Sequence, residues 1–444
     1  MLLVEFRDKQ NREKGEVFWF KRDKKVPNTG RDLKMEDVKK YGLPVKICVA
    51  LLLFTQMTQA LVNPSLMGIM ADLPGSSATT YQTIINIATL VMIFSALAAA
   101  PLVKKVGFKT TGLIGMACCF IGGITPAFIH PSIAVLIVER AFFGIGYGIV
   151  YSSGIAACGE FWRGKETTNM VGVATFAAGL AGIIYNLASS MIAPMGWTYI
   201  YWINFVIIPF MVYYAIFMPQ HSEFGANEAS AGAGKKSGFS FSGLGKSFWI
   251  YIVCMMVALA AVCAFMNNIA MIVIGTGIDA TGAAVGIIMT GFGAGLMIGG
   301  AVYPIAYRCL KRAALPVFLL IDAICFLVIM LHSSYVVLIV CATIIGIMFG
   351  ALNASWSDMG NKKVADYPAA SSSGASIFIA AAGLAQFLSP FFLALLAGAL
   401  GMSEANPFYQ YYPAIAIIGV GGIVLLVMAI LKKNKVDYEH EDLA

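Results

Sequence analysis

The chain is a series of apolar runs, each about twenty residues long, separated by short charged or Pro/Gly-rich segments. A helix of that length crosses a bilayer, because a spanning segment must satisfy its backbone hydrogen bonds internally. Twelve such runs lie at 47–69, 80–102, 110–129, 133–159, 168–190, 197–218, 248–272, 282–306, 314–331, 335–357, 370–398 and 408–431. We therefore expect an all-α polytopic membrane protein with twelve transmembrane helices.

Composition agrees with this expectation. Of the 444 residues, 59% are hydrophobic and only 12% are charged, which is more apolar surface than a soluble core could hide. The net charge of +7 therefore does not indicate a nucleic-acid partner. The nine cysteines lie mostly inside apolar runs, with no CxxC pair and no histidine at metal-ligand spacing. We expect no disulfide framework, no metal and no cofactor.

The basic residues indicate the orientation in the membrane. Of the 30 Lys and Arg residues, 29 fall in tails and loops at one end of the twelve runs. Cytoplasmic loops carry such an excess, so we expect both termini in the cytoplasm and a multi-pass protein of the cell (inner) membrane. The one exception is Arg140, which lies inside the fourth run.

Composition also divides the chain into parts. The segment between the sixth and seventh runs is rich in Gly, Ser and Ala, which is typical of a flexible linker. Aromatic and basic residues at 16–25 indicate either a segment lying on anionic lipid or a disordered tail. The expected parts are an N-terminal cytoplasmic tail (1–46), two six-helix bundles (47–218 and 248–431), the cytoplasmic linker between them (219–247) and a C-terminal cytoplasmic tail (432–444).

The two bundles resemble each other in sequence. The string GIGYGIVYSS at 144–153 has a counterpart in GIMFGALNAS at 346–355, and AAGLA occurs at 177–181 and at 381–385. The offsets of 202 and 204 residues nearly agree, which is improbable for chance matches between apolar strings. Parallel repeats of six helices are a common plan of secondary transporters, whose binding site lies between the two halves.

The fourth run resembles the fourth-helix signature of the major facilitator superfamily. That signature has a leucine, an arginine four residues on and a pair of glycines, which match Leu136, Arg140, Gly144 and Gly146. The resemblance to this superfamily extends over about residues 47–432. It implies two pseudo-symmetric six-helix halves and a secondary transporter that works by alternating access.

Two further stretches resemble motifs of this superfamily, and a third departs from them. PLVKKVGFKTTG at 101–112 is similar to the loop between its second and third helices, although Lys104 stands where the motif usually has Asp. GWTYIYWIN at 196–204 is similar to the start of its sixth helix in drug exporters and related branches. Antiporters usually carry a Gly-Pro motif in the fifth helix, whereas this chain has GLAGIIYNLASS at 179–190, which argues against proton-driven drug efflux.

Polar side chains at helical spacing indicate the faces that we expect to contact a solute. Polar residues inside membrane helices face the interior of the bundle, and intervals of three and four residues keep them on one helical face. The expected solute-binding residues are Gln59, Asn63, Arg140, Tyr147, Tyr151, Asn186, Asn267, Asn268, Asn353, Trp356 and Gln386. The alternative for any amide in this set is a hydrogen bond to a neighbouring helix.

Arg140 needs a partner, because a charge inside a bilayer costs roughly 3 kcal/mol or more. Its guanidinium could bind a substrate anion through two hydrogen bonds. It could instead tune a carboxylate that carries a proton, for which Glu139 is the first candidate. The structural alternative is an ion pair with Glu139 or with Asp322 in the ninth run. We therefore expect Glu139, Arg140 and Asp322 to be the coupling residues.

These features predict a secondary active transporter of a small organic solute, neutral or monoanionic and partly apolar, with protons as a candidate coupling ion. One cation among amides and aromatic rings suits such a solute better than an organic cation or a sugar phosphate. The alternatives are a proton-coupled efflux antiporter for drugs or metabolites and, less favoured, a polytopic membrane enzyme or sensor. The four histidines are scattered, and no segment is long enough for a soluble output domain. We expect a monomer whose partners are the solute, the lipid bilayer and protons, without nucleic acid.

Overall fold

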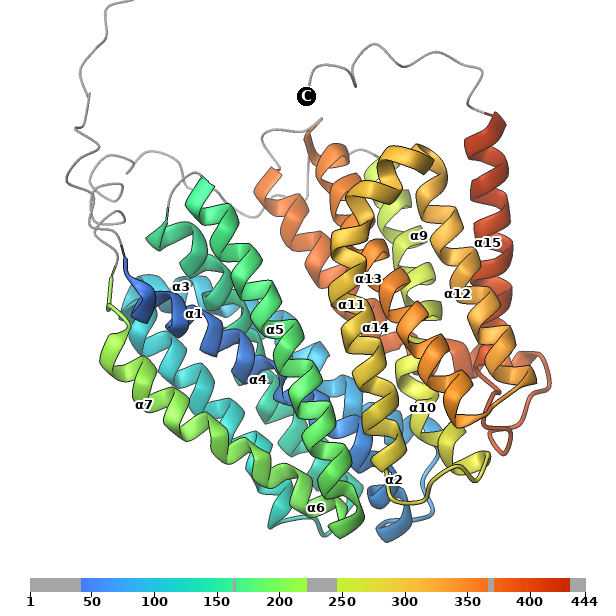
Figure 1. Ribbon diagram of the computed structural model, residues 1–444, viewed down its shortest axis with the longest axis horizontal. Helices are drawn as coiled ribbons and strands as arrows, with labels where there is room; N and C mark the ends of the chain where they lie inside the picture. Colours follow the sequence, from blue (N-terminus) through green and yellow to red (C-terminus); the bar gives the residue numbers. More distant parts are fainter. Residues whose placement is uncertain (1–40, 163–164, 222–245, 366–370, 432–444) are drawn as a thin grey trace, which may run out of the picture. The chain divides into compact units, whose positions relative to one another are not determined.

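The computed structural model describes residues 41–162, 165–221, 246–365 and 371–431, which contain helices and no strand (Figure 1). Eleven helical segments are long and apolar enough to cross a membrane. The longest of them, Ala78–Ala127, contains two spans joined at a kink, so the twelve predicted spans are present. The surface segment 16–25, most of the linker and the C-terminal tail lie outside the described residues, and their boundaries stay predictions.

The first half contains six spans. The bounds of its helices are α1 (Leu43–Gln56), α2 (Val62–Asp72), α3 (Ala78–Ile124), α4 (Ile133–Phe161), α5 (Lys165–Ile192), α6 (Trp197–Ile200) and α7 (Ile207–Phe217). Two spans are interrupted by 3₁₀ segments. Met57–Leu61 separates α1 from α2 in the first span, and Tyr201–Val206 separates α6 from α7 in the sixth.

The second half also contains six spans. The bounds of its helices are α9 (Lys246–Val262), α10 (Ala264–Gly275), α11 (Ala283–Leu310), α12 (Ala314–Leu331), α13 (Tyr335–Ala365), α14 (Ser371–Ala399) and α15 (Tyr411–Leu431). The seventh span is broken at Cys263, between α9 and α10. All nine cysteines are free thiols, six of them buried, as expected for small apolar residues in membrane helices.

Tight glycine contacts repeat in the two halves. A Cβ at Gly144 in α4 would lie 2.7 Å from the main-chain oxygen of Ala88 in α3. Gly346 in α13 makes the same kind of close approach to the main-chain oxygen of Phe292 in α11. The glycines four residues further on, Gly148 and Gly350, repeat the arrangement one turn along. The contacts match at the offsets of 202 and 204 residues found in the sequence, so the repeat is a repeat of helix packing.

The interruptions of the first and seventh spans are also related by the repeat. The 3₁₀ segment of the first span has Gln59 at its centre, and the break of the seventh span lies 204 residues later, at Cys263. A 3₁₀ stretch inside a longer helix often marks a hinge. Interrupted helices at corresponding positions in the two halves of a membrane protein are the best local indication of its binding site. These two breaks therefore direct attention to the side chains around Gln59 and the start of α10.

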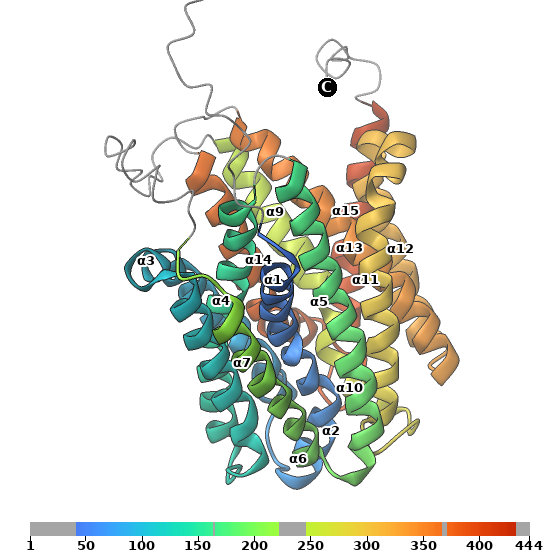
Figure 2. The same ribbon diagram turned by 60° about the vertical axis from the view of Figure 1, so that its left-hand side comes forward.

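The two halves pack together along two helix pairs, α5 with α11 and α3 with α14 (Figures 1 and 2). We call the end of the bundle with loops 73–77, 128–132, 193–196, 276–282, 332–334 and 400–410 the non-basic end, because these loops contain no Lys or Arg. The opposite end, which holds loops 103–110 and 308–313, is the basic end. At the non-basic end, α2 also contacts α10 and α11 across the two halves.

Candidate functional site

Arg140 lies deep inside the first half, next to the interruption of the first span. Its side chain is 1% exposed, and Nη2 donates a hydrogen bond to Oε1 of Gln59. Gln59 in turn donates from Nε2 to the main-chain oxygen of Ile85, 2.8 Å away, in α3. The guanidinium also stacks on Phe143, with Cζ 4.4 Å from the ring centroid. A neutral amide and a ring face therefore hold Arg140, and its charge is not neutralised by either.

Several buried polar atoms of the first half have no hydrogen-bond partner among the described residues. They belong to three helical segments that pack together, namely the first span, α4 and α5. The atoms are Oε1 of Gln56, Oδ1 of Asn63, Nε of Arg140, the hydroxyl of Tyr185 and Oδ1 of Asn186. Buried polar groups are almost always paired, so a cluster of unpaired ones is a place where a polar ligand or water gains hydrogen bonds.

The other predicted residues of α4 line the same interior. Tyr147 lies against Gln56 and stacks on Phe143 at 6.1 Å between ring centroids. Tyr151, one turn further on, is half-buried. Glu139 is also half-buried, and its Oε2 lacks a partner among the described residues, beside Thr125. Gly144 faces α3 instead of this interior, where it allows the close approach of the two helices.

Asn267 and Asn268 in α10 lie at the contact between the halves. The Oδ1 of Asn267 accepts a 2.9 Å hydrogen bond from Asn86 of α3, and the Oδ1 of Asn268 accepts a 3.0 Å bond from Gln82. Both asparagines are buried. Asn186 of α5 donates to the main-chain oxygen of Gly182 in its own helix at 2.9 Å.

The remaining predicted residues of the second half are less engaged with the first. Asn353 in α13 is half-buried and donates to the main-chain oxygen of Phe349 at 2.9 Å. Trp356 is buried in the core of the second half, and its main-chain oxygen accepts a 2.6 Å bond from Tyr251. Gln386 in α14 is half-buried. Of the predicted residues of the first half, Gln59 hydrogen-bonds Arg140, and those of the second half lie on three helices.

Asp322 is separate from this cluster. It lies in α12, which packs on α13 and α15 of its own half, and neither carboxylate oxygen has a hydrogen-bond partner among the described residues. The predicted alternative of an Arg140–Asp322 ion pair is therefore not formed. Among the described residues, no three His, Cys, Asp or Glu side chains gather as a metal site would require.

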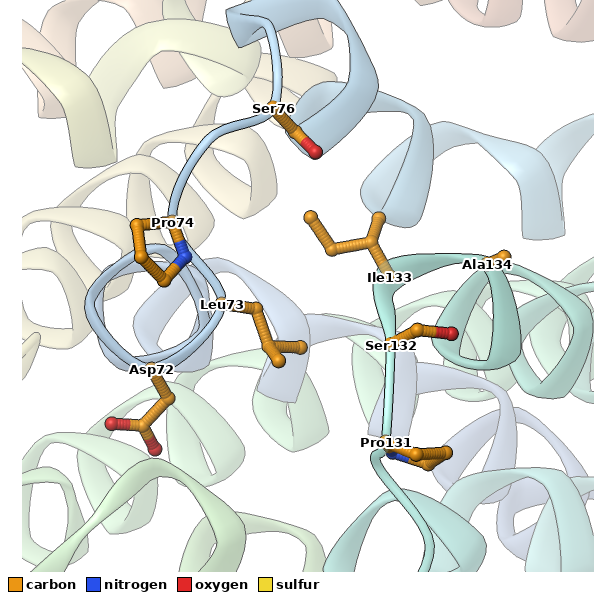
Figure 3. A pocket seen from close by; sticks show the side chains of 8 residues that line it. All are labelled: Asp72, Leu73, Pro74, Ser76, Pro131, Ser132, Ile133 and Ala134. Atoms are coloured by element: carbon orange, nitrogen blue, oxygen red, sulfur yellow. The ribbon is translucent and has the colours of Figure 1, made fainter.

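A separate depression lies at the non-basic end of the first half (Figure 3). Its volume is about 470 Å³, and it is lined by the segments 72–76 and 131–134. Asp72 at its edge accepts a 2.6 Å hydrogen bond from the indole of Trp197. None of the predicted solute-binding residues lines this depression, so it is distinct from the interior around Arg140.

The sequence prediction missed the partners of the two asparagines. Gln82 and Asn86 stand four residues apart in α3, a spacing that would have revealed a polar face. Ser389 and Gln410 are single polar residues, and only the packing of the helices brings them to α10, where they hydrogen-bond Asn267 and Asn268. Gln56 was recognisable as part of the polar stripe of the first run, one turn before Gln59.

Comparison with known proteins found a matching family model and several solved structures with a similar fold. The family model described as Major Facilitator Superfamily matches residues 48–376. A D-xylose–proton symporter is similar in structure, with a TM-score of 0.66 at 12% identity over 87% of this chain and 97% of that one. The nucleoside transporter NupG (TM-score 0.65, 12% identity, 86% and 99% covered) is also similar. A bacterial homologue of the human lysosomal transporter Spinster is similar as well, with a TM-score of 0.62 at 14% identity over 88% of this chain and 96% of that one. No curated protein sequence matches significantly.

Proposed function

Because this chain belongs to the Major Facilitator Superfamily, we propose that it moves a small organic solute, neutral or monoanionic and partly apolar, across the cell membrane by alternating access. The predicted family and the twelve-helix fold are confirmed, and the chain is a transporter, not an enzyme. The solute, its direction of movement and the coupling ion belong to the proposal. The positive-inside rule supports a cytoplasmic position for the basic end.

The observation that supports this solute class is the surroundings of Arg140. Arg140 is the one buried cation among the residues that the structure describes, and it is bonded to the neutral Gln59, so it can meet at most one negative charge of a solute. The free Nε of Arg140 and the unpartnered atoms of Gln56, Asn63 and Asn186 offer further hydrogen bonds. Tyr147, Phe143 and Tyr185 supply ring surface for an apolar part. In this proposal Tyr151, Asn353, Trp356 and Gln386 complete the lining.

Proton coupling is the second element of the proposal. Glu139 is next to Arg140 in α4, and its half-buried carboxyl group has one oxygen without a partner among the described residues. A carboxyl group beside a buried guanidinium responds to whatever binds the guanidinium, because the two charges interact strongly at low dielectric. Binding of a monoanionic solute to Arg140 would therefore change the proton affinity of Glu139 and couple the two events.

The experiment uses the purified full-length protein. Thermal-shift screening against a metabolite library identifies a ligand, and uptake of that ligand into proteoliposomes measures transport. We expect Arg140→Ala to weaken binding roughly 10- to 100-fold, since a hydrogen bond to a charged group contributes about 1.5–3 kcal/mol. Arg140→Lys tests whether the charge alone suffices. Arg308→Ala removes one positive charge from an exposed position at the basic end and is the matched control.

Three results separate the alternatives. Loss of the ligand-induced shift in Arg140→Ala, with an unchanged elution profile of the protein and a normal shift in Arg308→Ala, supports the proposal. Wild-type binding and uptake by Arg140→Ala would refute it. Extrusion of lipophilic compounds driven by a pH gradient, without binding of any monoanion, would favour the efflux antiporter instead.

A further inference from the structure

Six buried polar side chains form one hydrogen-bonded cluster at the contact between the two halves. We call it the amide cluster, and its members are Gln82, Asn86, Asn267, Asn268, Ser389 and Gln410. Each of the six is at most 2% exposed. The first two come from α3 of the first half, and the others come from α10, α14 and the residue just before α15.

Within the amide cluster, every bond between the halves involves Gln82 or Asn86 of α3. Nε2 of Gln82 donates to Oδ1 of Asn268 at 3.0 Å and to the main-chain oxygen of Asn267 at 3.2 Å. Gln82 also forms a reciprocal amide pair with Gln410, whose Nε2 donates to Oε1 of Gln82 at 3.0 Å. One turn further along α3, Asn86 donates to Oδ1 of Asn267 at 2.9 Å.

The second-half members of the cluster are held in place by their own half. Asn268 donates to Gln410 at 2.8 Å, and Asn267 donates to Ser389 at 3.1 Å. Ser389 in turn donates to the main-chain oxygen of Ala260 at 2.6 Å. None of these bonds crosses between the halves, so separation of the halves does not require any of them to break.

The position of the cluster indicates what it controls. It lies close to the non-basic end, where the main-chain NH of Ala78 also bonds the Glu404 carboxylate across the halves at 3.2 Å, and Ser190 bonds the main-chain oxygen of Ala283 at 2.7 Å. The α3–α10 contact is thus one of the contacts that join the halves at this end, together with those of α2 with α10 and α11. Neutral amides suit a contact that opens repeatedly, because water can replace each hydrogen bond without exposing or burying a charge.

We propose that the amide cluster is the closing contact of the non-basic end, and that Gln82 and Asn86 set the balance between the closed and open states of that end. The proposal rests on the alternating-access function proposed above. It assigns Asn267 and Asn268 to closure of the path, and it leaves solute binding to the residues around Arg140.

Hydrogen–deuterium exchange of the purified protein tests this proposal without any solute. Gln82→Met removes the amide at nearly constant volume, and Asn86→Leu removes the second bond. We expect exchange of peptides covering 73–80 and 400–410 to rise by roughly threefold for each hydrogen bond lost, and therefore more in Gln82→Met than in Asn86→Leu. Exchange of 103–112 and 308–313 at the basic end should fall, because that end closes when the other opens.

The matched control is Asn204→Leu. Asn204 is also a buried amide, but it bonds the main-chain oxygens of Gly123 and Tyr201 within the first half only, so this variant should leave the balance between the ends unchanged. If Gln82→Met does not fold, Gln82→Asn keeps an amide that is too short to reach Gln410, and a smaller shift in the same direction is expected. Unchanged exchange at the non-basic end, or an equal rise at both ends, would overturn the proposal. The exchange experiment uses no solute, so its result would remain valid even if no transported solute were found.

Discussion

Gly107 has a backbone conformation that residues with a side chain rarely adopt. Its φ of +81° turns α3 back on itself between the second and third spans, and a Cβ there would collide with the main-chain oxygen of Gln220. That oxygen accepts a 2.9 Å hydrogen bond from the NH of Phe108. In the repeat, Lys311 stands 204 residues later, with a φ of +47°. Among the described residues it is the one non-glycine with positive φ, so both loops contain a residue at positive φ, which glycine tolerates best.

We expect Gly107→Ala to lower the thermal stability of the protein more than Gly75→Ala does. Gly75 also has a positive φ, of +98°, but a Cβ there would meet nothing within 4 Å. Both variants therefore suffer backbone strain of about 1–2 kcal/mol. Only Gly107→Ala adds overpacking, of about 1–3 kcal/mol. Thermal unfolding of the purified variants measures the difference, and equal melting temperatures would show that the Gln220 contact is unimportant.

Helical spacing in the sequence can place a polar residue on one face of its own helix. Gln59 and Arg140 each stand out as polar residues inside an apolar run, and the structure joins them by a hydrogen bond. The partners of Asn267 were not predictable, because Asn86 is 181 residues away and any amide in a membrane helix is an equally good donor by sequence. Which amides meet depends on the rotation and tilt of whole helices, and spacing along one helix carries no information about these.

At the scale of elements, few of the described helices begin with a side chain that accepts a hydrogen bond from their first free NH groups, as Ser77 does for α3. At the start of α11, the side chain that accepts such a hydrogen bond is Asp279, in the preceding loop. Its carboxylate accepts hydrogen bonds from the main-chain NH of Ala284 at 2.8 Å and from the NH and hydroxyl of Thr281 at 2.9 and 2.8 Å. Burial alone would raise the pKa of Asp279, but these hydrogen bonds lower it below its ordinary value. The ionised carboxylate of Asp279 thus helps to stabilise the loop before α11.

Asp279→Ala should therefore lower the free energy of unfolding by about 1 kcal/mol at neutral pH. The pKa of Asp279 is lower in the folded state than in the unfolded state. Its contribution is complete above the unfolded value of about 4 and disappears as the pH falls through the folded value. Melting temperatures of wild type and Asp279→Ala should converge as the pH falls below about 4. Asp279→Asn keeps an acceptor without the charge and serves as the control. A constant difference from pH 7 to pH 3 would contradict this explanation.

At the scale of the whole molecule, the two halves meet through small residues that permit close approach of helices. Along the pair α5 and α11, a Cβ at Gly286 would lie 2.7 Å from the main-chain oxygen of Asn186 and 2.8 Å from Cβ of Ser190. This contact lies on the side of the non-basic end, since Ser190 also bonds Ala283 at the start of α11. The packing of the halves at this end therefore depends on the absence of one methyl group.

Gly286→Ala should push the halves apart at the non-basic end. Overpacking of about 1–3 kcal/mol would shift the ratio of the two states by roughly 5- to 150-fold. Spin labels at the exposed Ser76 and Ser403, in a protein whose exposed Cys254 and Cys309 are serine, report the separation of the halves by electron–electron double resonance. Gly300→Ala is the matched control on the same helix, because a Cβ there meets nothing within 4 Å. A longer distance between the labels in Gly286→Ala, but not in Gly300→Ala, would show that the packing of α5 on α11 influences whether the non-basic end is closed or open. Identical distances in both variants would mean that the halves absorb the methyl group by local adjustment.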